Sequence, residues 1–167
     1  DGFMLRQSSR GMRWCSLNVA EREAGSCIEV IEHVPSIEDA TRGTVNVLTS
    51  LQPRIGIFTT PNYEANLALA VAANDGPAKN LKKQKFREAD HKFEFTRHEF
   101  LSWINTVQSS VKAACPGVEY TFKTFEVGDL SKYSEGKTCG GASQGVMFTR
   151  STGRSIITSL SQSQAGK

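Results

Sequence analysis

The stretch SCIEVIEHV, residues 26–34, combines a short β-branched run with charged side chains. Pro35 blocks helical continuation, and a short apolar run such as residues 27–31 is typical of a buried parallel strand. Glu29 lies inside this run, and an ionised carboxylate among apolar side chains costs several kcal/mol unless a cation or a hydrogen-bond donor compensates it. The stretch therefore predicts a parallel strand with a compensated polar site at its end.

Glu29, Glu32 and His33 are the side chains of this stretch that can bind a metal ion. In open α/β sheets, ligands bind beyond the carboxyl ends of the parallel strands, so all three would share one crevice. A divalent ion bound there would compensate both carboxylates. The alternative is that Glu29 pairs with a neighbouring arginine or lysine and that His33 caps a turn. The pattern alone leaves both interpretations open.

The composition indicates one globular domain. The chain has 167 residues, of which 38% are hydrophobic, and this is enough for one ordinary core. A net charge of +3 is too small to indicate a nucleic-acid partner by itself. The four cysteines form no CxxC pair, and the longest apolar run, residues 67–73, is far shorter than the roughly 20 residues of a membrane span. We expect a reduced protein of the cytoplasm or nucleus, without a membrane segment.

Capping signals and apolar periodicity place the remaining elements. Three helices are predicted, each behind a side chain that can cap it: residues 37–51 after Ser36, residues 64–73 after Asn62, and a helix between Thr96 and Cys115. The further strands are predicted over residues 54–59, 119–127 and 145–150. The first strand, helix and second strand form a parallel βαβ unit, and the last two strands form an antiparallel hairpin.

A second polar stretch, DHKFEFTRHEF at residues 90–100, places His91 between a polar loop and a capped helix. From this position its side chain can reach a neighbouring strand end, although a surface hydrogen bond would also explain a lone histidine. The loop before it, residues 74–90, carries a group of basic side chains that can grip phosphates: Lys79, Lys82, Lys83, Lys85 and Arg87. A solvated loop explains the same charges equally well.

Three motifs carry a family resemblance. EVIEH at residues 29–33, TPNYEAN at residues 60–66, and FR with DHKFEFTR within residues 86–97 resemble the small-RNA 2′-O-methyltransferases, which cap the 3′ ends of microRNAs, siRNAs or piRNAs. The resemblance covers about residues 26–127. It implies an α/β fold, Rossmann-like, with S-adenosylmethionine as methyl donor. It also implies a divalent metal, Mg²⁺ or Mn²⁺, held by Glu29, Glu32, His33 and His91.

The same resemblance implies how these residues would act. The metal would bind the hydroxyls of the terminal ribose, and His33 or His91 would help to remove the 2′-hydroxyl proton. Asn62 and Tyr63 would face the terminal nucleotide, although capping and packing explain both residues as well. The implied partners are the 3′ end of a small RNA and silencing proteins loaded with small RNA.

One part of the family pattern is missing from the sequence. A glycine-rich acidic motif, which would end the first cofactor-binding strand, does not precede Glu29. The glycine cluster at residues 140–145 precedes no helix and is predicted to be a hairpin loop. We therefore expect an irregular segment over residues 1–25, a partial methyltransferase catalytic domain over residues 26–150 that lacks the N-terminal cofactor-binding strands, and a flexible tail over residues 151–167. An inactive truncated fragment that still binds metal and an RNA 3′ end is the alternative.

Overall fold

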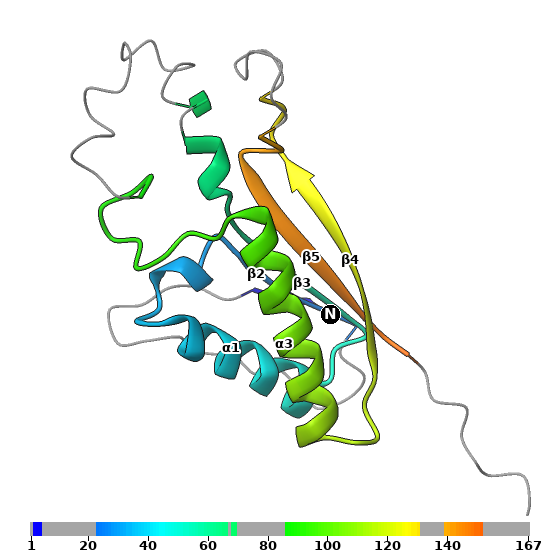
Figure 1. Ribbon diagram of the computed structural model, residues 1–167. Coiled ribbons are helices and arrows are strands. Elements are labelled where there is room, and N and C mark those ends of the chain that lie inside the picture. Colours follow the sequence, from blue (N-terminus) through cyan, green and yellow to red (C-terminus); the bar gives the residue numbers. More distant parts are fainter. Residues whose placement is uncertain (1, 5–22, 67, 70–85, 131–138, 152–167) are drawn as a thin grey trace, which may run out of the picture.

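The computed structural model describes residues 2–4, 23–66, 68–69, 86–130 and 139–151. Within this part of the chain, one five-stranded sheet carries α1 and α3 on the same face (Figure 1). The strand order is β1-β2-β3-β5-β4, with bounds β1 Gly2–Met4, β2 Ala24–Ile28, β3 Ile55–Pro61, β4 Tyr120–Val127 and β5 Ser143–Arg150. β1, β2 and β3 run parallel, whereas β5 is antiparallel to β3 and β4. The predicted parallel pairing and the final antiparallel pair are both confirmed.

The first predicted strand lies closer to the N-terminus than expected. β2 ends at Ile28, and residues Ile31–His33 form the 3₁₀ turn η1. Glu29 adopts a φ of 50°, in the left-handed region, and this conformation ends the strand. Val30 and Ile31 are still buried in the core. Because a buried turn and a buried strand show the same apolar run, the sequence pattern did not separate them.

The prediction that residues 1–25 are irregular is wrong at both ends of that segment. Residues 2–4 form β1, which pairs with β2, and residues 24–25 begin β2 itself. A strand of three residues is too short for a periodic pattern to reveal it. Three stretches lie outside the described residues: residues 5–22, the lysine-rich stretch within residues 70–85, and residues 152–167 of the tail predicted over residues 151–167.

Both long helices begin where the capping signals place them. The Ser36 hydroxyl accepts a hydrogen bond from the backbone N–H of Asp39 and caps α1, Ile37–Asn46. A wider π-helical turn, η2 (Val47–Leu51), carries this helix to its predicted end. Thr96 and Glu99 form the predicted capping box of α3, Arg97–Ala114.

The predicted helix over residues 64–73 is described in part. The turn η3, Tyr63–Ala65, begins it with Asn62 as the cap, and residues 66, 68 and 69 are helical. Residues 67 and 70–73 lie outside the described part. Among the described residues, no helix combines the length and the apolarity that a membrane span needs.

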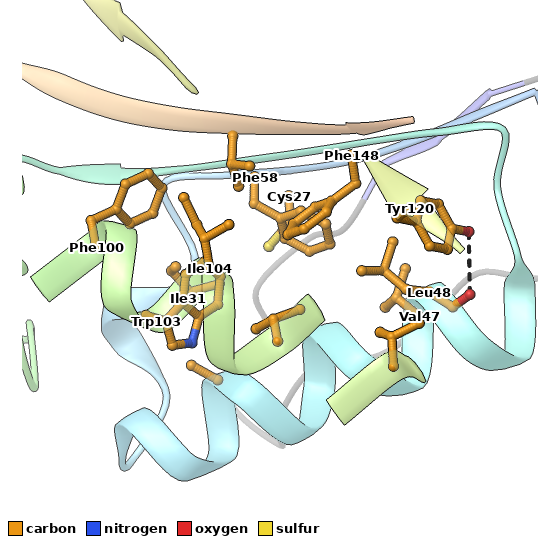
Figure 2. Close-up of a cluster of buried hydrophobic side chains, with 14 of the residues drawn as sticks. Cys27, Ile31, Val47, Leu48, Phe58, Phe100, Trp103, Ile104, Tyr120 and Phe148 are labelled. Atoms are coloured by element: carbon orange, nitrogen blue, oxygen red, sulfur yellow. Dashed lines mark hydrogen bonds between the residues drawn. The ribbon is translucent and has the colours of Figure 1, made fainter. Parts of the chain in front are cut away.

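The core fills the space between the two helices and the sheet (Figure 2). One face of α3 supplies five buried apolar side chains: Phe100, Trp103, Ile104, Val107 and Val111. The Trp103 indole N–H donates to Thr41 Oγ1 at 3.0 Å, and the Tyr120 hydroxyl lies 3.2 Å from the Leu48 carbonyl oxygen. Ile37, at the start of α1, is 45% exposed and lines an open cavity.

Candidate metal centre

Glu32, His33 and His91 come together at the carboxyl end of β2. Each offers one potential ligand atom, and these atoms all lie within 4.8 Å of one another. Glu32 and His33 belong to η1, whereas His91 lies on the segment that leads into α3. The backbone N–H of Lys92 donates to the Glu32 carbonyl oxygen at 2.8 Å and so ties the two segments together. The structure thus brings together three of the four predicted ligands.

The Glu32 carboxylate is fully buried and only half satisfied. Its Oε2 accepts a hydrogen bond from the Thr60 hydroxyl at 3.1 Å, but Oε1 has no hydrogen-bond partner. Burial is the main cause that raises the pKa of Glu32 to about 7, and the nearby charge of Glu29 adds to the shift. A buried anionic oxygen without a donor is unfavourable, and a cation beside it would remove that cost.

The two histidines each place one ring nitrogen against a carboxylate. His91 Nδ1 lies 2.6 Å from Glu94 Oε1, and His33 Nδ1 lies 3.0 Å from Asp90 Oδ2, without the alignment of a hydrogen bond. The two rings meet edge to face, with centroids 4.8 Å apart. His33 Nε2 lies 3.7 Å from Glu32 Oε1. In metal sites, a histidine ligand is commonly oriented in this way by a carboxylate on its other nitrogen.

Glu29, the fourth predicted ligand, lies beside this group and outside it. Its Oε2 accepts a hydrogen bond from the Ser143 hydroxyl at 3.2 Å, and its Oε1 is buried without a partner. The backbone N–H of Glu29 lies 3.2 Å from the carbonyl oxygen of Thr59 and 3.1 Å from its hydroxyl. These contacts hold the residue at the end of β2, and its role as a ligand stays a prediction.

The donor set fits a divalent cation. Two buried carboxylate oxygens, Oε1 of Glu29 and of Glu32, have no hydrogen-bond partner, and two imidazoles stand beside the second of them. Carboxylates alone would suit Mg²⁺, whereas imidazoles favour Mn²⁺ or another transition ion.

The sequence did not indicate the three side chains that contact the candidate ligands, Thr60, Asp90 and Glu94. For Glu94, the available signal was its position three residues after His91.

Asn62 does not face a ligand, and its predicted RNA contact is wrong. The residue is fully buried. Its side-chain amide donates to the carbonyl oxygens of Cys139 at 2.7 Å and Gly141 at 3.0 Å, and its Oδ1 accepts from the N–H of Glu64 at 3.0 Å. The amide is thus fully used in capping η3 and in holding the segment before β5.

Arg87, a predicted phosphate contact, donates hydrogen bonds inside the protein. One Nη of its half-buried guanidinium donates to the Ala142 carbonyl oxygen at 2.6 Å, and its Nε donates to Asn66 Oδ1 at 3.3 Å. These hydrogen bonds hold two segments together, and a phosphate contact of Arg87 stays a prediction. The other predicted phosphate contacts lie outside the described residues: Lys79, Lys82, Lys83 and Lys85.

Tyr63 remains available for a ligand. Its side chain is 44% exposed, and its ring lies 6.5 Å from that of Phe86. Both rings line an open cavity of about 600 Å³ that also reaches Glu94 and Trp103. An exposed aromatic side chain on the wall of such a cavity is suitably placed to stack on a base.

Comparisons with known proteins agree with this arrangement. No model of a known protein family matches the chain. The small RNA 2′-O-methyltransferase of Caenorhabditis elegans is 39% identical over 85 residues, which are 51% of this chain and 17% of that protein. The Drosophila melanogaster protein of the same name is 31% identical over 135 residues, 81% of this chain and 31% of that protein. The crystal structure of the small RNA methyltransferase HEN1 matches with a TM-score of 0.59 and 30% identity, over 84% of this chain and 14% of that one.

The fold and the centre together define a class. The chain is an α/β protein of the Rossmann-like methyltransferase fold, with a carboxylate–histidine group at the end of a parallel strand. Within this class, it belongs to the small-RNA 2′-O-methyltransferase family. It spans less than a third of the length of either relative. The predicted fold class and family are confirmed.

Proposed function

We propose that this chain is part of a methyltransferase that transfers a methyl group from S-adenosylmethionine to the 2′-hydroxyl of the 3′-terminal nucleotide of a small RNA. The observation that carries the proposal is the buried Glu32 Oε1, which has no hydrogen-bond partner and stands beside two imidazoles. A ribose diol and a divalent ion would complete such a site. The names of the relatives supply the substrate class.

Glu32, His33 and His91 would hold the ion, with Glu29 as a fourth ligand from the end of β2. A bound Mg²⁺ or Mn²⁺ supplies Lewis-acid chemistry that lowers the pKa of a coordinated hydroxyl. The buried carboxylates would balance the charge of the ion, and the Thr60 hydroxyl would keep Glu32 Oε2 occupied so that Oε1 faces the ion.

His33 and His91 are also the proposed proton acceptors. An imidazole nitrogen that binds a cation has no lone pair for a proton, so each Nε2 can take only one of the two roles in a given step. The His33 side chain is 15% exposed, against 5% for His91, and it lies 3.0 Å from the largely exposed carboxylate of Asp90. His33 therefore has the shorter route for a proton to reach solvent.

No described residue is assigned to the methyl donor. Within the described residues, no strand passes into a helix through a glycine-rich turn, which is the element that holds such cofactors. The glycine cluster at residues 140–145 runs into the antiparallel strand β5, as predicted. S-adenosylmethionine is proposed from the class of the protein alone.

The proposed partner is the 3′ end of a small RNA. Tyr63 would stack on a terminal base, and the four lysines between residues 79 and 85 would contact phosphates. Silencing proteins loaded with small RNA are proposed as further partners, with the cytoplasm or nucleus as the place of action. Salt sensitivity of binding would report the lysine contacts.

The test is methyl transfer by the purified chain with Mn²⁺, labelled S-adenosylmethionine and a small RNA that ends in a 2′,3′-diol. Label is expected on this RNA and not on the same RNA with a terminal 2′-deoxyribose, and a chelator should abolish the transfer. Glu32→Gln should lose transfer, whereas Glu38→Gln, which removes an exposed carboxylate on α1, should keep it. Absence of transfer with the diol RNA would contradict the activity of this chain.

A catalytically inactive module is the second candidate. The described residues hold the metal-ligand group but no glycine-rich cofactor turn, and this observation favours a module that binds metal and an RNA 3′ end without methylating it. Titration with S-adenosylhomocysteine separates the two candidates. Binding supports the enzyme, and RNA binding without S-adenosylhomocysteine binding supports the module.

A further inference from the structure

Glu94 is a buried carboxylate that contacts the candidate ligand His91 without belonging to the ligand group itself. Its side chain is fully buried, and three polar groups converge on it. The Asn66 amide donates to Oε2 at 2.6 Å, the backbone N–H of Arg87 donates to Oε1 at 2.7 Å, and His91 Nδ1 lies 2.6 Å from Oε1. We propose that Glu94 is a positioning residue, which fixes the tautomer and the orientation of His91 so that Nε2 is presented to the ion.

The hydrogen bonds decide which atom carries the proton. One donor already points at each oxygen of Glu94, an amide at one and a backbone N–H at the other. A carboxylate in this position acts as an acceptor, so the hydrogen of the 2.6 Å contact belongs to His91 Nδ1. The Nε2 of His91 then carries the free lone pair, which is the form that binds a metal.

The orientation of His91 depends on segments that are distant in the sequence. Glu94 links the two ends of the stretch from residue 87 to residue 94, because its Oε1 accepts a hydrogen bond from the backbone N–H of Arg87. Asn66, in the helical segment after η3, holds the second oxygen and also accepts from Arg87 Nε at 3.3 Å. Arg87 in turn donates to Ala142, just before β5. Because these contacts leave the Glu94 carboxylate little freedom, its removal would release the His91 ring.

This inference rests on the proposed metal function, but one of its tests does not need the metal. Long-range proton–nitrogen NMR of the histidine rings in the metal-free protein reports which nitrogen carries the proton, with His91 assigned by comparison with His91→Gln. The wild-type protein should show His91 as the Nδ1–H tautomer. In Glu94→Ala, His91 should become a mixture of the Nδ1–H and Nε2–H tautomers, because a neutral imidazole without this acceptor carries its proton mainly on Nε2.

The second readout is the affinity for Mn²⁺, measured by calorimetry and corrected for the folded fraction. Glu94→Ala should lower the affinity roughly 10- to 100-fold, as is typical for loss of such a carboxylate. Glu94→Gln should lower it less and keep the Nδ1–H tautomer, because its amide oxygen can still accept from His91. Glu64→Gln is the matched control. It removes a carboxylate that holds Arg97 at the start of α3, and it should leave both readouts unchanged.

The two readouts separate the failures. Absence of Mn²⁺ binding by the wild-type protein would overturn the proposed metal function, while the tautomer of His91 would still test Glu94. An Nε2–H tautomer in the wild-type protein, or an unchanged tautomer in both Glu94 variants, would overturn the role of Glu94. If Glu94→Ala does not fold, Glu94→Gln provides the decision: an affinity equal to that of the wild type would overturn the proposal.

Discussion

Asn62 offers a sharp test of the structural role that replaces its predicted RNA contact. The residue caps η3 through Oδ1 and holds the carbonyl groups of Cys139 and Gly141 through Nδ2. Asn62→Ala removes all of these contacts, whereas Asn62→Asp keeps the acceptor and removes the donor. The two substitutions therefore separate the capping of η3 from the hydrogen bonds to the carbonyl groups of Cys139 and Gly141.

The magnitudes follow from the contacts. Loss of an N-cap costs about 1 kcal/mol, and each buried hydrogen bond to a carbonyl contributes about 1 kcal/mol, so Asn62→Ala should cost about 3 kcal/mol. Asp is as good a cap as Asn, and capping alone would make Asn62→Asp neutral. In this structure, however, the new carboxylate would face two carbonyl oxygens in a buried position. Asn62→Asp should therefore cost more than Asn62→Ala at pH 8, and less at low pH, where the carboxyl is protonated.

The assay is urea unfolding followed by circular dichroism at pH 8, with ΔG from linear extrapolation. For a chain of this size, the expected loss for Asn62→Ala corresponds to a decrease in Tm of about 6–12 °C. Asn105→Asp, on the exposed face of α3, is the control and should stay within about 0.5 kcal/mol of the wild type. If Asn62→Asp were as stable as the wild type and bound RNA more weakly, the reasoning would be refuted, and the prediction that Asn62 contacts RNA would hold.

Three further predictions use the same purified protein. In chelator-treated protein, Glu32→Gln should raise the free energy of unfolding by about 3 kcal/mol at pH 8 and not at pH 4.5. The folded-state pKa of about 7 lies above the unfolded value of 4.5, so the stability that Glu32 contributes below pH 4.5 is lost as the pH rises through 7; urea titrations at both pH values measure this. Burial raises the pKa of Cys27 to about 12, so mass spectrometry should find Cys27 unalkylated by iodoacetamide at pH 8 in the folded protein and alkylated in urea. Tyr63→Ala should weaken binding of an RNA 3′ end by about 1–3 kcal/mol in a fluorescence titration, and Tyr63→Phe should not; equal affinities would exclude stacking.

The sequence predicted the helices more accurately than the strand that carries the site. Ser36 and Thr96 are local signals, because the cap and the backbone N–H that it binds are three residues apart, and both helices start as predicted. The end of β2 depends on distant partners. Its last residue, Ile28, pairs with Thr59, and the positive φ of Glu29 follows at once. No local pattern encodes that pairing, so the predicted strand ran too far.

The candidate metal ligands were identified from the sequence, and the side chains that contact them were not. Glu32 and His33 are adjacent in the sequence, and His91 was added by the family resemblance. The side chains that contact them, Thr60 and Glu94, act across the fold or as part of a buried network, and the only sequence signal was the three-residue spacing of Glu94 from His91. The prediction for Asn62 was wrong for a different reason. Its capping role was recognisable, but its burial depended on the segment before β5, almost eighty residues later.

The position of Glu29 shows why the centre lies where it does. The strand ends that meet here come from β2, from β3, and from the start of the antiparallel strand β5, because Pro61 at the end of β3 pairs with Ser143 at the beginning of β5. Ser143 donates to one oxygen of Glu29 and leaves the other buried without a partner, as Thr60 does for Glu32. In each carboxylate, one oxygen thus accepts a hydrogen bond from a hydroxyl on another strand, Thr60 on β3 or Ser143 on β5. Among the described residues, no lysine or arginine pairs with either of the two oxygens that lack a hydrogen-bond partner, and the proposed divalent ion would compensate both.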